Sequence, residues 1–259
     1  MKKNKAPRAL CAEKIESLLG IAHVRVLDMI DSTNNEAKRM LENGFRGFAL
    51  IAAEMQTDGR GRLGRSFYSP ESTGLYFTLI IPPCFLAEEA TLLTPAAAVA
   101  TVRALEKISG ESLKIKWVND IYKNDKKICG ILAEAVLETE NGGFAGFAVG
   151  VGINLTTKDF PKEIADIATS LQTNADRNEI AASIARELFD FAKNLSAREF
   201  LPEYREHSLV TGKEIYFIKD GEKTSATALG IDNDGGLTVR LENGGLTTLR
   251  GGEISIRIR

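Results

Sequence analysis

The spacing of turn residues after Ser208 constrains the fold most strongly. Five short β-type runs follow one another there, separated by the turn sequences DG, NDGG, ENGG and RGG at intervals of roughly ten residues. Such spacing is typical of a small all-β barrel. Because no Gly/Ser-rich linker precedes it, we expect two domains that pack together, a larger one over residues 1–208 and a small β domain over residues 209–259.

The larger part mixes strand and helix patterns. Strands are expected at residues 48–56, 74–82, 113–117, 126–138 and 144–155, the last two joined through a turn at Asn141, Gly142 and Gly143. Helical spacing or capping residues predict helices at residues 10–20, 31–44, 91–110 and 178–207. The fold class expected is therefore α+β.

Composition excludes several classes of protein. Lysine plus arginine number 33 and aspartate plus glutamate 35, so no overall charge favours DNA or an anionic membrane as partner. Cys11, Cys84 and Cys129 are widely spaced, which argues against a disulfide framework or a zinc site. With no signal peptide and no apolar run of roughly 18 residues, a cytoplasmic protein without DNA or membrane partners is expected.

The sequence QTDGRGRLGRSFY, residues 56–68, is the most unusual local feature. Glycines let the backbone approach a ligand closely, and Arg60, Arg62 and Arg65 can pair with phosphate or carboxylate oxygens. A loop of this composition has little reason to order until an anion is present, so we expect a lid that closes over a ligand. The alternative is an exposed basic loop without a ligand.

A second candidate is KWVNDIYKNDKKICGIL, residues 116–132. If IKW and KKICGIL form neighbouring antiparallel strands, Lys116 and Lys127 share a face and Asn119 and Asp120 occupy the turn between them. Amine groups beside oxygen ligands for Mg²⁺ suit a nucleoside triphosphate. The alternative is a lysine-rich turn exposed to solvent.

Two further motifs are ambiguous alone. In DSTNN, the hydroxyls of Ser32 and Thr33 can cap a helix or bind a small polar group. The glycines of GVGINL, which ends near Asn154, indicate that some group approaches this strand closely.

In combination, DSTN, EMQTDGRGRLGRSFYSP, KWVNDIY, KKICGILAEA, GVGINL and GGEISIR resemble the motifs of the biotin protein ligases, over residues 26–258. The resemblance implies a catalytic domain like that of class II aminoacyl-tRNA synthetases, with a mixed sheet flanked by helices, and an SH3-like C-terminal barrel. It also implies that biotin and MgATP give biotinyl-5′-adenylate, and that biotin then passes to a lysine of a biotin carboxyl carrier protein.

The resemblance assigns residues to overlapping roles. Implied biotin-binding residues are Ser32, Thr33, Asn34, Gln56, Gly59, Arg60, Gly61, Arg62, Lys127 and Gly130. Implied nucleotide-binding residues are Arg60, Arg62, Trp117, Asn119, Lys127, Asn154 and Arg257. Implied catalytic residues are Lys127, Arg60, Arg62 and Asp120, and Asn119 and Asp120 would help to place Mg²⁺.

Two departures from the family pattern matter. Val118 stands where the family usually has proline, so a less rigid turn is expected. Few residues precede Asp31, which predicts a monofunctional enzyme without the N-terminal DNA-binding domain. A lipoate protein ligase of the same fold and a non-enzymatic biotin- or nucleotide-sensing module stay open as alternatives, as does a homodimer.

Overall fold

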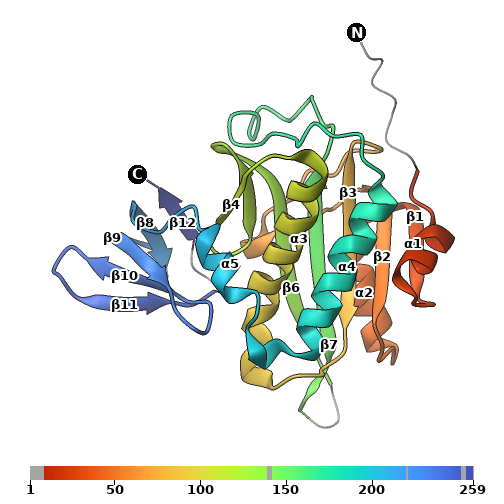
Figure 1. Cartoon of the computed structure of the whole chain (residues 1–259), viewed down its shortest axis with the longest axis horizontal. Helices are drawn as coiled ribbons and strands as arrows, with labels where there is room; N and C mark the ends of the chain where they lie inside the picture. The colour runs from red at the N-terminus through yellow and green to blue at the C-terminus, as the bar shows by residue number, and fades with distance from the viewer. Residues whose placement is uncertain (1–8, 139–141, 220, 252–254, 259) are drawn as a thin grey trace.

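The computed structural model describes residues 9–138, 142–219, 221–251 and 255–258. The larger of its two sheets has the strand order β1-β2-β3-β7-β6-β5-β4 (Figure 1). β1 and β2 are parallel and the other neighbours are antiparallel, which confirms the predicted mixed sheet. Its strands are β1 Val24–Ile30, β2 Ala49–Gln56, β3 Gly74–Ile81, β4 Leu113–Lys116, β5 Asp120–Lys123, β6 Lys126–Leu137 and β7 Phe144–Asn154.

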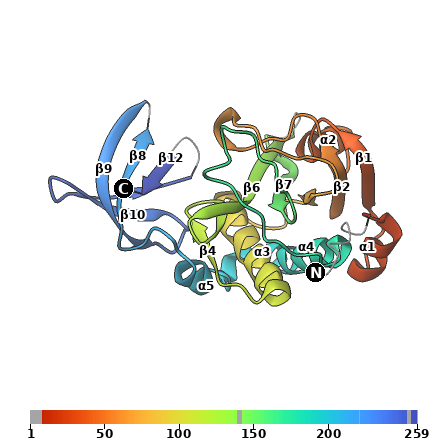
Figure 2. The ribbon, with the colours of Figure 1, turned by 90° about the horizontal axis from the view of Figure 1, so that it is seen from above.

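Helices cover both faces of this sheet. α1, α3 and α4 lie together on one face, and α2 lies on the other (Figure 2). The buried alanines of α3 allow it to pack closely, and the helix ends at Gly110, whose φ of 68° suits glycine. The helices are α1 Ala12–Leu19, α2 Thr33–Glu42, α3 Leu93–Ser109, α4 Arg177–Lys193 and α5 Leu201–Glu206, with 3₁₀ turns η1 Arg62–Gly64, η2 Ala87–Leu92 and η3 Leu195–Ala197. No helix of the described residues is long and apolar enough to cross a membrane.

Three expectations about this domain were wrong. The strands expected at 113–117 and 126–138 are not neighbours, because β5 lies between β4 and β6. β5 has four residues and a single fully buried one, Ile121, which is too short a pattern to read. β1, an edge strand with mixed burial, was not predicted. The helix expected over 178–207 is broken between α4 and α5, where Arg198 has a φ of 53°.

The C-terminal part is an antiparallel sheet of order β11-β10-β9-β8-β12. The described residues show no pairing of the edge strands β11 and β12 that would close the expected barrel. Asn141 of the expected turn and residues 252–254 of GGEISIR lie outside the described residues. The strands are β8 Glu214–Lys219, β9 Glu222–Ile231, β10 Leu237–Leu241, β11 Leu246–Leu249 and β12 Ser255–Ile258.

The two parts pack against each other, as expected. Buried apolar side chains of both sheets belong to one continuous core. Trp117 Nε1 donates to the carbonyl of Gly235 at 2.9 Å, and Arg205 Nε donates to the carbonyl of Ile231 at 2.9 Å. These contacts bring β12 to the edge of the site described next.

Candidate active site

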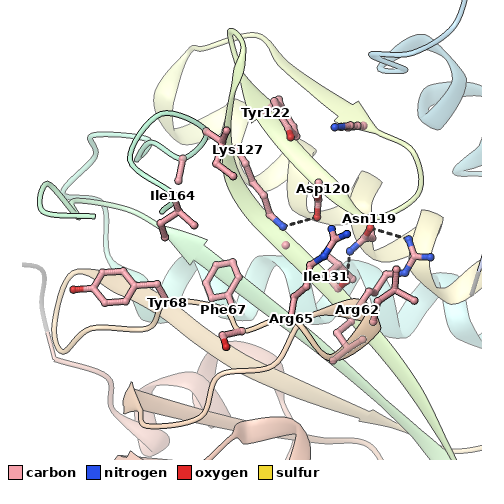
Figure 3. A pocket seen from close by; sticks show the side chains of 18 of the residues that line it. Arg62, Arg65, Phe67, Tyr68, Asn119, Asp120, Tyr122, Lys127, Ile131 and Ile164 are labelled. Atoms are coloured by element: carbon pink, nitrogen blue, oxygen red, sulfur yellow. Dashed lines mark hydrogen bonds and ion pairs between the residues drawn. The ribbon is translucent and has the colours of Figure 1, made fainter. Parts of the chain in front are cut away.

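Residues 59–65, with the sequence GRGRLGR, are here called the Gly/Arg loop. A cavity of about 330 Å³, here called the large cavity, opens between this loop and the strands β4, β5 and β6 (Figure 3). Residues 160–168 and β12 complete its wall. Among the described lining residues, six side chains are basic and Asp120 is the only carboxylate. The basic residues are Arg60, Arg62, Arg65, Lys116, Lys127 and Arg257. A cavity of this charge favours an anionic ligand.

Strand register brings Lys127 and Asp120 together. Asp120 of β5 pairs with Gly130 of β6, and Tyr122 pairs with Lys127, so these residues face the cavity side by side. Lys127 Nζ lies 2.6 Å from Asp120 Oδ1. A Cβ at position 130 would lie 3.0 Å from Lys127 Nζ, so Gly130 leaves the lysine room to lie across its strand.

Asn119 acts as a bridge between the sheet and the loop. Its Nδ2 donates to the carbonyl of Ile131 at 2.8 Å, and its Oδ1 accepts from Arg62 Nη1 at 3.1 Å. Burial lowers the pKa of Arg62, and the negative charge of Asp120 partly opposes that effect. Asn119 therefore holds Arg62 at the wall of the large cavity.

The same contacts test the expected Mg²⁺ site. Both amide atoms of Asn119 have protein partners, and Asp120 is ion-paired with Lys127. No group of three His, Cys, Asp or Glu side chains that could hold a metal occurs within the described parts of the chain. Asp120 is thus the one anionic ligand among the described residues of the cavity wall, and Mg²⁺ would be held mostly by oxygens of a bound phosphate chain.

A second cavity of about 20 Å³, the small cavity, adjoins the first through Arg60, Phe67, Gly130 and Leu132. Ser32, Thr33 and Gln56 line it together. The backbone N–H and hydroxyl of Thr33 donate to Gln56 Oε1 at 2.9 and 3.1 Å, and Gln56 Nε2 donates to Ser69 Oγ at 2.9 Å. The Ser32 hydroxyl makes no capping hydrogen bond with α2, so helix capping does not explain it.

Asn34 supports this cavity from behind. Its Oδ1 accepts from the Thr78 hydroxyl at 2.6 Å, and its Nδ2 donates to Glu134 Oε2 at 2.9 Å. A Cβ on Gly150 would lie 2.0 Å from Asn34 Oδ1, which accounts for one glycine of GVGINL. The amide of Asn34 is therefore engaged with the protein and holds neighbouring groups in place.

Phe67 is a site residue that sequence reasoning missed. It lines both cavities, and a Cβ on Gly152 would lie 2.6 Å from its Cε1. Lys127 Nζ lies 5.9 Å from the ring centroid. Other aromatic and apolar wall residues that were missed include Tyr68, Phe160, Ile164 and Ile167. The last three lie in a loop without any repeating apolar pattern, so periodicity gave no signal for them.

The glycines of the loop have structural roles. A Cβ on Gly59 would lie 2.4 Å from the carbonyl oxygen of Phe67, so a side chain there would block the turn. The Gly61 N–H donates to the carbonyl of Arg65 at 2.7 Å and is used within the loop. Arg60 Nη1 donates to Asn35 Oδ1 at 2.9 Å, which anchors the loop to α2.

The remaining expected residues also line the large cavity. Trp117 is 5% exposed, and its indole N–H is bonded to Gly235. The Trp117–Val118 peptide is cis, and the Val118 carbonyl accepts from the buried Tyr204 hydroxyl at 2.9 Å. Asn154 Oδ1 is buried without a hydrogen-bond partner in the described residues, so it is ready to accept from a ligand.

Comparison with known proteins agrees with this geometry. Residues 26–154 match the biotin/lipoate A/B protein ligase family, and residues 210–257 match the biotin protein ligase C-terminal domain. The bifunctional ligase/repressor BirA of Bacillus spizizenii is 33% identical over 235 residues, which cover 86% of this chain and 70% of that protein.

Two further relatives extend the match. The biotin–[acetyl-CoA-carboxylase] ligase of Mycobacterium tuberculosis is 28% identical over 242 residues, covering 87% of this chain and 86% of that protein. The structure of biotin protein ligase from Aquifex aeolicus in complex with biotin and ATP has a TM-score of 0.77 and 29% identity, and the match covers 92% of this chain and 100% of that chain. Sequence, fold and the arrangement of the cavity together show that the chain belongs to the biotin protein ligase family.

Proposed function

We propose that this chain activates biotin with ATP to biotinyl-5′-adenylate and transfers biotin to a lysine of a biotin carboxyl carrier protein. The observation that carries the proposal is the Lys127–Asp120 pair in the strongly basic large cavity, beside Gly130, which also lines the polar small cavity. In the first step two anions, a carboxylate and a triphosphate, have to meet. Basic side chains reduce their repulsion as charge develops in the transition state.

The groups that line the two cavities match the two substrates, and the small cavity, at about 20 Å³, has to widen to admit the ureido ring. Ser32, Thr33 and Gln56 offer hydroxyl and amide groups to the ureido ring of biotin, and the basic cavity accepts the phosphates of ATP. Lys127 lines the large cavity beside Gly130, which both cavities share, and would contact the biotin carboxylate and the α-phosphate. Mg²⁺ would arrive with the phosphates and neutralise part of their charge.

The second step needs a neutral amine on the acceptor lysine. Asp120 is the only carboxylate among the described lining residues, so it is the candidate base for that proton. The apolar wall of Phe67, Phe160 and Ile164 would keep water from the mixed anhydride. The name of the mycobacterial relative suggests acetyl-CoA carboxylase as the source of the carrier domain.

A mass-spectrometric assay tests the proposal. Protein, MgATP and a biotin carboxyl carrier domain are incubated with biotin in one reaction and with lipoate in a matched one. We expect the mass of one biotinyl group on one carrier lysine, together with pyrophosphate release that depends on biotin. Lipoyl transfer would favour the lipoate ligase alternative, and biotin binding without any pyrophosphate release would favour a sensing module.

A further inference from the structure

Lys116 faces the large cavity on one side of Asp120, and Lys127 faces it on the other side. It is the last residue of β4, and it pairs directly with Asp120, which pairs with Gly130 of β6. Directly opposed residues of antiparallel strands project to the same face, so one lysine stands on each side of the carboxylate. The backbones of β4 and β6 are two strand spacings, roughly 10 Å, apart.

Only one of these lysines is paired. Asp120 Oδ1 lies 2.6 Å from Lys127 Nζ. Within the described residues Lys116 has no ion pair, and its ammonium lies 5.6 Å from the centroid of the Tyr122 ring. A half-buried ammonium that lacks a carboxylate partner and faces a cavity is suited to a ligand anion.

The charges around Lys116 also favour an anionic ligand there. Burial lowers its pKa, and the positive charges of Arg257, Lys127 and Arg65 lower it further, with Asp120 opposing them in part. These groups come from the Gly/Arg loop, β5, β6 and β12, so charge converges on one region from four directions. Such a cluster becomes favourable when a multiply charged anion binds between its members.

We propose that Lys116 holds the pyrophosphate that leaves in the adenylation step, a role distinct from that of Lys127. The inference rests on the proposed function. A biotin carboxylate oxygen attacks the α-phosphorus, and the bond from that phosphorus to the oxygen bridging to the β-phosphorus breaks. The electron pair leaves with the bridging oxygen, and pyrophosphate departs. Lys116 keeps its proton and compensates the charge that develops on this leaving group.

This role separates the two half-reactions. Lys127 stays beside the α-phosphate, which is retained in the adenylate. Lys116 contacts a group that has left before the carrier lysine attacks. Removal of Lys116 should therefore slow adenylation and leave transfer from preformed adenylate intact.

The test uses Lys116→Met, Lys116→Arg and the control Lys114→Met. Lys114 lies on the same strand but does not line the large cavity, and its Nζ lies 3.5 Å from the carbonyl of Glu206. Two rates are measured: biotin-dependent pyrophosphate release from ATP, and biotin transfer from synthetic biotinyl-5′-adenylate to a carrier domain. Inhibition of the first rate by added inorganic pyrophosphate is measured as well.

We expect Lys116→Met to lose on the order of 10²-fold in pyrophosphate release, the effect of removing one donor that stabilises developing charge. Its transfer rate should stay unchanged, and inhibition by pyrophosphate should weaken. Lys116→Arg should recover part of the loss, because it keeps the charge. Lys114→Met should match the wild type in both rates.

Three outcomes would overturn the inference: an unchanged release rate in Lys116→Met, an equal loss in both half-reactions, or unchanged inhibition by pyrophosphate. Failure of the proposed function looks different. In that case the wild-type protein itself neither releases pyrophosphate with biotin nor transfers biotin from the synthetic adenylate.

Discussion

The small cavity and the large cavity adjoin each other but are built from different chemistry. Around the small cavity the hydroxyl and amide groups are bonded to one another: Thr33 and Ser69 are buried, and both are bonded to the half-buried Gln56. Around the large cavity, the described lining residues include six basic side chains and one carboxylate. The first set is neutral and internally satisfied, whereas the second carries like charges that favour binding of an anion.

This difference separates stability from activity. A satisfied buried network contributes to folding, and removing one member leaves a partner without its hydrogen bond. A cluster of like charges contributes little to folding and much to the binding of a charged transition state. We therefore expect substitutions around the small cavity to change stability and biotin affinity together, and substitutions around the large cavity to change catalysis almost alone.

Lys127→Ala should have the largest effect. Its ammonium would compensate both the biotin carboxylate and the α-phosphate, so adenylate formation should fall by on the order of 10³-fold. The side chains of Lys127 and Asp120 are 30% and 25% exposed, and the loss of such a pair should cost about 1 kcal/mol of stability or less. Pyrophosphate release and thermal unfolding are the measurements.

The matched control is Lys126→Ala, on the same strand. Lys126 is exposed and does not line the large cavity. It should leave both adenylation and melting temperature unchanged. A Lys127→Ala protein that loses melting temperature in proportion to its activity would contradict the separation of stability from catalysis.

Arg62→Gly should have the next largest effect. Arg62 connects the loop to Asn119, so glycine removes that contact and makes the loop more flexible. Adenylate synthesis should persist in part while the intermediate escapes roughly tenfold faster, about 1.4 kcal/mol of lost retention. The ratio of free adenylate to carrier-bound biotin measures this escape.

Arg62→Lys keeps the charge, so its rate of adenylate escape should lie between those of the wild type and Arg62→Gly. Protease cleavage of the loop, with and without biotin, tests the lid directly. Cleavage that is indifferent to biotin, together with normal retention by Arg62→Gly, would mean that the loop is not a lid.

Many residues of the two cavities could be predicted from the sequence. The Gly/Arg loop, the KWVND motif and Lys127 were assigned to the site because the motifs in combination resemble those of the biotin protein ligases, whereas each motif alone left a ligand-free alternative open. The position of Asp120 was not predicted correctly, since β5 has too few residues to show a period. The sequence therefore indicated which residues meet, but the order of β4, β5 and β6 was needed to see that Lys116 and Lys127 flank Asp120.

Other features depend on packing that no local pattern encodes. Ser32 and Thr33 fit a helix cap equally well in the sequence, and only the structure shows that Ser32 makes no such bond. Phe67 reads as an ordinary aromatic residue after a loop. Its importance comes from contact with Gly152, which is distant in sequence and meets it through the sheet.

Thr78→Val should have a smaller effect than Arg62→Gly on turnover but should lower stability. Thr78 is fully buried, its hydroxyl donates to Asn34 Oδ1, and it lies 2.8 Å from the Thr33 hydroxyl. Removing it leaves Asn34 Oδ1 without this donor, a cost of about 1–3 kcal/mol. The KM for biotin should rise and that for ATP should not.

Thr101→Val is the matched control. Thr101 is equally buried, but its hydroxyl bonds to the Ala97 carbonyl within α3. This substitution should leave the KM for biotin unchanged. If both substitutions raise the KM for biotin alike, the hydrogen bonds around the small cavity have no specific effect on biotin binding.

The smallest expected effect is a change in the emission of Trp117, the only tryptophan of the chain. The indole lines the large cavity, and its N–H is fixed on Gly235 of the C-terminal sheet. Because it is 5% exposed, only a ligand in that cavity should alter its surroundings. Biotin alone, whose ureido ring would contact the polar groups of the small cavity, should change the emission little, and biotin with MgATP should change it clearly. An equal change in emission with biotin alone would show that biotin by itself alters the surroundings of Trp117 in the large cavity.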